Sequence, residues 1–131
     1  MGGEPSASSL FDRMGGEPVL RAVIDDFVDR VFDDMMIGFL FRDVDRARIK
    51  QLEHEHASEF LGGPVRYSGR PMRAAHARHR ISSGQFGRRL VLLRQAMTAH
   101  GVPAEVQQAW LDHNEALRSQ VTEPAQSDCR D

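Results

Sequence analysis

One stretch of the chain constrains its fold more than any other, because its apolar residues recur at steps of three and four positions. These residues are Val19, Leu20, Val23, Ile24, Phe27, Val28 and Val31. The spacing places them along one side of an α-helix, and Pro18 suits the first turn because its missing amide donor is not needed there. The pattern predicts a helix over residues 17–33 with one buried face.

The rest of the chain also indicates helices, since it contains no run of strict apolar–polar alternation that would suggest a strand. The residues that mark helix boundaries are Ser8 or Ser9, Gly15, Asp43 or Asp45, Gly62, Ser82, Gly101 and Pro103. The apolar residues expected on the inner faces of the last two long helices are Phe86, Leu90, Leu93, Met97, Val106, Trp110, Leu111, Leu117 and Val121. The sequence predicts an all-α domain over residues 9–121, with four long helices, between flexible polar ends at residues 1–8 and 122–131.

Length, charge and cysteine content narrow the class of protein. The 131 residues suffice for one domain, and 17 basic against 19 acidic residues give 17 − 19 = −2, which offers no field for nucleic acid or an anionic membrane. The longest apolar stretch, Met35 to Phe41, is far shorter than a membrane span. No secretory signal is evident, and the single cysteine, Cys129, cannot form an internal disulfide. We therefore expect a cytoplasmic protein.

The helix that begins near Asp45 carries two polar residues on its expected apolar face. That face consists of Ile49, Leu52, Glu53, His56 and Phe60. A histidine there needs a hydrogen-bond partner or a metal, and Glu53 lies one turn before His56. The pair also matches one half of a di-iron carboxylate motif, but the second copy that such a site requires is missing. The remaining histidines of the helices, His54, His100 and His113, are expected to face solvent.

His76 follows Met72 by one helical turn, and the small alanines between them leave room for a large flat group. Histidine is the commonest metal ligand in proteins. Taken alone, His76 is also explained as a half-buried, hydrogen-bonded residue of a short helix. His79 lies three residues further on and is the rival for any ligand role.

Six stretches, in order along the chain, resemble the truncated haemoglobins, which are short globins with a two-over-two helical sandwich around haem. The stretches are Ser9-Leu10-Phe11 with Met14-Gly15-Gly16, Val23 to Val31, Phe39-Leu40-Phe41 with Asp43-Val44-Asp45, Phe60-Leu61-Gly62-Gly63, Tyr67-Ser68-Gly69-Arg70, and Met72-Arg73-Ala74-Ala75-His76. The resemblance covers residues 9–121. Its glycine pairs are similar to the first and second family subgroups, and the spacing after His76 to the second and third.

The resemblance implies haem b as cofactor, with His76 as the proximal iron ligand and Phe41 packed flat on the haem. The other residues that it places against the cofactor are Phe27, Leu52, Met72, Arg73, Phe86 and Leu90. Arg48, Lys50, Arg70 and Arg73 could pair with the haem propionates, or could be ordinary surface charges. The distal ligand pocket falls on Val28, Ile49, Glu53 and His56.

The distal residues depart from the family pattern. Val28 stands where the family often has a tyrosine that hydrogen-bonds bound oxygen, and His56 replaces a usual phenylalanine. Arg89 falls at a position that is commonly apolar, where it could pair with Glu53 or with a propionate. We expect Glu53 and His56 to supply the distal polarity, or His56 to coordinate the iron itself.

The expected function is reversible binding of a diatomic gas (O2, NO or CO) at the iron, with an unidentified reductase as partner and a monomer or weak dimer as the assembly. Turnover of nitric oxide or peroxide is left open, because the haem supplies that reactivity. Two alternatives remain: a haem-free globin fold acting as a sensor or interaction module, and a non-haem metal site at Glu53 and His56.

Overall fold

The computed structural model describes residues 9–69 and 81–121 of the chain. Its elements are α1 (Leu10–Met14), α2 (Glu17–Asp33), the 3-10 helix η1 (Gly38–Phe41), α3 (Arg46–Leu61), α5 (Ser83–Ala99), α6 (Ala104–Ala116) and α7 (Arg118–Val121). These residues contain no strand, so the all-α fold class is confirmed. The helix expected over residues 17–33 has those bounds in the structure.

Side-chain caps and glycines fix the helix ends where the sequence indicated them. Ser9 accepts a hydrogen bond from the backbone N–H of Asp12 at the start of α1, and Asp45 caps α3 in the same manner. Ser82 and Gln85 form a capping box at α5, in which each side chain bonds the other residue's backbone N–H. Gly62 ends α3 with a φ of 91°, a left-handed conformation that glycine adopts without strain.

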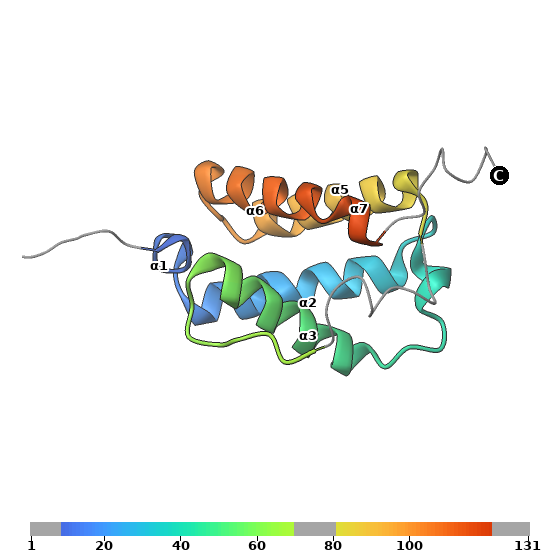
Figure 1. Cartoon of the computed structure of the whole chain (residues 1–131), viewed down its shortest axis with the longest axis horizontal. Helices are drawn as coiled ribbons and strands as arrows, with labels where there is room; N and C mark the ends of the chain where they lie inside the picture. Colours follow the sequence, from blue (N-terminus) through green and yellow to red (C-terminus); the bar gives the residue numbers. More distant parts are fainter. Residues whose placement is uncertain (1–8, 70–80, 122–131) are drawn as a thin grey trace, which may run out of the picture.

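The long helices form two layers of two (Figure 1). In that view α2 and α3 make the lower layer, and α5 and α6 make the upper one. α2 packs against α3 within its layer and against α5 across the layers, and η1 contacts the end of α2. This arrangement is the predicted two-over-two sandwich.

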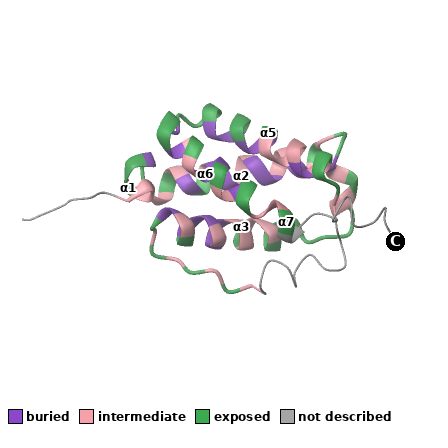
Figure 2. Cartoon of the chain, turned by 45° about the horizontal axis from the view of Figure 1, so that its top comes forward, coloured by how far each residue is buried: buried purple, intermediate pink, exposed green. Residues whose placement is uncertain are grey.

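The core lies between the layers, where buried residues gather on the facing sides of the helices (Figure 2). The buried residues of α2 are Leu20, Val23, Ile24, Phe27, Val28 and Val31. Burying side chains of this size contributes about 1.5–3 kcal/mol each. Apart from the half-buried Val19, all the predicted stripe of α2 is therefore core, as its periodicity indicated.

The apolar stretch from Met35 to Phe41 is only partly buried. Ile37 is buried, but Met35, Met36 and Phe39 are 97%, 60% and 54% exposed. The stretch forms the turn between α2 and α3, so only the side that faces the sandwich can be covered. Within the described residues, no helix is long and apolar enough to cross a membrane.

α3 buries a different face from the one expected. Its buried residues are His54, Glu55, Ala57, Ser58 and Leu61, whereas the predicted stripe of Ile49, Leu52, Glu53, His56 and Phe60 is half-buried. α3 packs against α2, and the loop after α3 bonds Ser58 and Glu55, so polar side chains on this face are covered. The expectation that His54 faces solvent is wrong: its side chain is 5% exposed, and Nε2 lies 3.0 Å from both carboxylate oxygens of Glu17.

Candidate functional site

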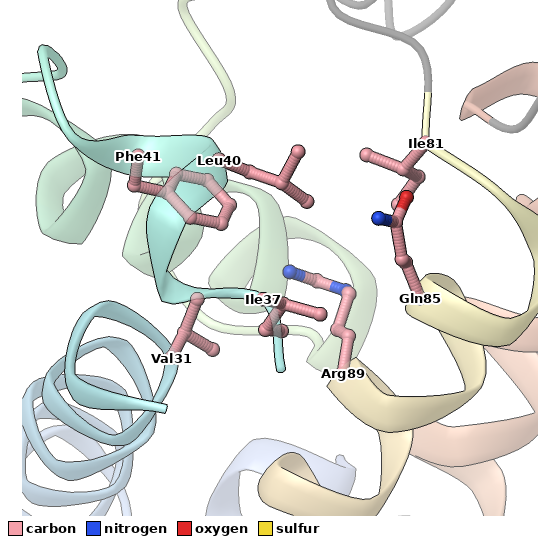
Figure 3. Close-up of a pocket in the computed structure, with 7 residues that line it drawn as sticks. All are labelled: Val31, Ile37, Leu40, Phe41, Ile81, Gln85 and Arg89. Atoms are coloured by element: carbon pink, nitrogen blue, oxygen red, sulfur yellow. The ribbon is translucent and has the colours of Figure 1, made fainter. Parts of the chain in front are cut away.

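A cavity of about 30 Å³ opens between η1 and α5 (Figure 3). Its lining residues are Val31, Ile37, Leu40, Phe41, Ile81, Gln85 and Arg89. Five of the seven are apolar, and the two polar side chains both come from α5. The space accommodates a diatomic molecule, since one water needs about 10–15 Å³ by a comparable measure. A porphyrin would have to lie along the apolar side chains around it.

Several apolar residues of η1, α3 and α5 are only partly buried, which fits an apolar cofactor. Leu40, Phe41, Ile49 and Leu90 pack against the core but are only partly buried, and Leu52 is half-buried as well. A flat apolar group placed against them would complete their burial at about 25 cal/mol per Å². Phe41, which the family resemblance places on the haem, is oriented by Phe32, whose ring centroid lies 5.2 Å away.

The remaining predicted cofactor residues fall into two groups. Phe27 and Phe86 are 1% exposed and belong to the core rather than to an open wall, and the distal residue Val28 is equally buried. Met72, Arg73 and His76 lie outside the described residues, and so does the short helix expected around them. The proximal ligand assignment therefore stays a prediction.

Arg89 and Glu53 form an ion pair beside the cavity. The two terminal guanidinium nitrogens of Arg89 donate to the two carboxylate oxygens of Glu53, at 2.8 and 3.1 Å, and one of them also donates to Oδ1 of Asn114 at 3.0 Å. The guanidinium carbon lies 4.9 Å from the centroid of the Phe27 ring, close enough for a cation–π contact. The sequence suggested Glu53 or a haem propionate as the partner of Arg89, and in the structure Arg89 pairs with Glu53.

His56 lies in a cluster of rings instead of bonding Glu53. Its ring centroid is 5.4 Å from those of Tyr67 and His113, and Phe60 stacks on His113 at 3.9 Å. Burial lowers the pKa of His56 below 6.5, although the negative charge of Glu53 opposes that shift. The sequence suggested Glu53 as the partner of His56, but the Glu53 carboxylate bonds Arg89.

His113 is also more enclosed than expected. Its Nε2 atom is buried and has no hydrogen-bond partner within the described part of the chain. Burial lowers its pKa below 6.5, and His56 lowers it further. The sequence placed His113 on the surface because the apolar pattern of α6 gives no sign that α3 approaches it. His100 is exposed as expected, with its Nε2 3.0 Å from Asp26.

Two glutamates that the sequence did not single out hold the loop after α3. Glu55 accepts hydrogen bonds from the backbone N–H and the hydroxyl of Ser68, at 3.0 and 2.7 Å, and Glu59 accepts from the backbone N–H of Tyr67 at 2.7 Å. The bonds from Ser68 hold the pKa of Glu55 below 4.5. These contacts link residues 8 to 13 positions apart, so no local motif could have revealed them.

Asp34 connects the turn after α2 to α5. Its carboxylate accepts from the backbone N–H groups of Met36 and Ile37, at 2.9 and 3.1 Å, and from the guanidinium of Arg88 at 2.7 and 3.0 Å. The Arg88 bonds, with those two backbone groups, hold the pKa of Asp34 below 3.8. Lys50, which was considered for a propionate, instead pairs with Asp29 of α2 at 3.1 Å.

Comparisons with known proteins agree with this geometry. The family model for bacterial-like globins matches residues 9–123. The group 1 truncated haemoglobin GlbN of Mycolicibacterium paratuberculosis is 36% identical over 98 residues, which are 75% of this chain and 72% of that protein. GlbN of a Nostoc species is 34% identical over 109 residues, which are 80% of this chain and 89% of that protein.

Solved structures share the fold. The Fe(III) form of truncated haemoglobin from Tetrahymena pyriformis superposes with a TM-score of 0.82 at 22% identity, covering 88% of this chain and 98% of that one. The group II truncated haemoglobin from Bacillus anthracis gives 0.81 at 23% identity, covering 91% and 94%. The family model, the curated relatives and the two-over-two architecture lead to one assignment: the chain belongs to the bacterial-like globins, as a truncated haemoglobin.

Proposed function

We propose that this globin binds haem b through His76 and reversibly binds oxygen or nitric oxide at the iron. Membership of the globin family implies a haem cofactor with iron and gas binding at that haem. The observation that supports the proposal most strongly is the apolar lining of the cavity, with Leu40 and Phe41 on one side and Ile81 on the other (Figure 3). Such walls suit a flat apolar cofactor better than a polar substrate.

In this proposal the haem supplies the site where the gas coordinates, and the protein supplies binding, orientation and polarity. Phe41, Leu52, Met72 and Leu90 contact the cofactor, Phe27 and Phe86 support those contacts from the core, and Arg73 reaches a propionate. Val28 and Ile49 make the distal side apolar. The polarity there comes from the ion pair of Glu53 with Arg89, and His56 lies among other rings.

We also propose that the protein works in the cytoplasm, as a monomer or weak dimer. Oxygen binds ferrous haem, so a reductase that returns ferric iron to the ferrous form would be the partner. CO would bind at the same position and serve as a probe. Each of these statements extends the family assignment.

The test is reconstitution of the purified chain with haem, read by its Soret band and by iron analysis. We expect a Soret band with one iron per chain in the wild type, and its loss in His76→Ala. His100→Ala is the matched control, because His100 is an exposed histidine at the end of α5 that bonds Asp26. An unchanged Soret band in His76→Ala would refute the ligand assignment.

The same measurements separate the alternatives. A high-spin ferric spectrum at neutral pH would exclude coordination by His56, and a folded chain without haem uptake would favour a sensor or interaction module. Metal without a Soret band would favour a site at Glu53 and His56. Within the described residues, however, no group of three or more histidine, cysteine, aspartate or glutamate side chains is arranged to hold a metal.

A further inference from the structure

We infer that Arg89 and Gln85 make the cavity a binding site for small anions, so that this globin selects anionic ligands as well as neutral gases. The inference rests on the proposed function, since the anion would bind beside the haem. It concerns two side chains of α5 that line the cavity among apolar residues (Figure 3).

One positive charge borders the cavity. Arg89 is the one charged residue among its seven lining residues, and Glu53, which neutralises it elsewhere, is not among them. The apolar neighbours keep the local dielectric low, so the guanidinium charge acts strongly on a nearby anion. Glu53 weakens this attraction, but Arg89 lines the cavity and Glu53 does not, so the positive group is the nearer charge to a bound anion.

The guanidinium also retains hydrogen-bonding capacity. An arginine has five N–H donors, and three hydrogen bonds from Arg89 are made, two to Glu53 and one to Asn114. Two donors therefore have no acceptor among the described residues. Because Glu53 and Asn114 hold the group in place, and the Phe27 ring packs 4.9 Å from its carbon, the donors are already oriented.

Gln85 adds a second donor to the same space. Its side-chain oxygen accepts the backbone N–H of Ser82 at 2.8 Å, as part of the capping box of α5. The oxygen is thereby fixed toward the helix end, and the amide nitrogen is turned toward the cavity (Figure 3). Two fixed donors on one side of an apolar cavity favour an acceptor that carries negative charge.

The experiment measures azide affinity of the ferric haem protein by absorbance, with CO binding to the ferrous form as the neutral reference. We expect Arg89→Leu to weaken azide binding about tenfold and to change CO affinity much less than azide affinity, because CO carries no charge. Gln85→Glu preserves an acceptor for the Ser82 N–H but adds a negative charge to the cavity, so it should weaken azide binding at least as much. Arg94→Leu is the matched control, because it removes the same charge from an exposed position of α5 and should change nothing.

The outcomes distinguish this inference from the proposed function. If the wild type takes up no haem, both are overturned. If the Soret band is present but azide affinity in Arg89→Leu and Gln85→Glu equals that of Arg94→Leu, only the anion site is overturned. Gln85→Glu keeps the Arg89–Glu53 pair intact, so its azide affinity tests the anion site even if Arg89→Leu unfolds.

Discussion

Gly38 lies where η1 approaches the end of α2, and replacing it with alanine should destabilise the protein. A Cβ built at this position would lie 2.5 Å from the backbone oxygen of Phe32 and 3.3 Å from that of Val31. Optimal separations between non-bonded heavy atoms are about 3.5–4.0 Å, so the overlap with the first oxygen is severe. Both neighbours are backbone atoms of α2, which a side-chain rotation cannot move.

Relief of this overlap requires η1 to shift away from α2. Overpacking of this kind costs about 1–3 kcal/mol. For a chain of this length, a loss of 1 kcal/mol lowers the melting temperature by roughly 4 °C, so we expect Gly38→Ala to melt about 4–12 °C lower. The shift also moves Leu40 and Phe41, so haem uptake should weaken in the same variant.

Thermal and urea unfolding followed by circular dichroism would measure the effect, with Gly87→Ala as the control. Gly87 lies inside α5, and a Cβ there would meet no atom within 4 Å. Alanine is favoured over glycine in a helix interior by about 1 kcal/mol, so this variant should be stabilised. If Gly38→Ala unfolds at or above the wild-type midpoint, the close approach of η1 to α2 is not as described.

Two further predictions concern the dependence of stability on pH. The pKa of Glu55 is lowered from 4.5 by its bonds to Ser68, so its contribution is present above pH 4.5 and is lost as pH falls through the folded value. Glu55→Gln should be less stable at pH 7 and should lose less stability on acidification, as urea titrations at several pH values would show; parallel curves would contradict this. The pKa of His113 is lowered from 6.5 by burial, so stability is highest above pH 6.5 and falls below it as the unfolded chain takes up the proton. His113→Phe, which retains stacking on Phe60, should be less sensitive to pH below 6.5 in the same titrations, and an unchanged slope would show that His113 is accessible.

Helix positions and the core of α2 followed from the sequence because they depend on local signals. Val23 and Phe27 lie on one periodic stripe, and Ser9 and Asp45 cap helices through bonds to backbone groups within three residues. Such features need no knowledge of distant segments. The sequence suggested two partners for Arg89, Glu53 and a haem propionate, and it could not decide between them.

The errors lie where one helix meets two different environments. α3 contacts α2, where His54 bonds Glu17, and it turns Glu53 toward Arg89 of α5 and His56 toward His113 of α6. A single apolar stripe cannot describe such a helix. The side that carries His54 is polar and was therefore expected to face solvent, but it is buried. The bond of His54 to Glu17 spans 37 residues, so it becomes visible only when both helices are in place.

The Asp34 carboxylate has a consequence for how ligands reach the cavity. It accepts from the backbone N–H of Ile37, which lines the cavity, and from the guanidinium of Arg88, the sequence neighbour of the lining residue Arg89. Opening the cavity by moving η1 away from α5 would break the charge-assisted bonds from Arg88, which are stronger than hydrogen bonds between neutral groups. These bonds hold η1 and α5 together on this side of the cavity. We therefore expect a ligand to enter by rotation of lining side chains and not by movement of η1 away from α5.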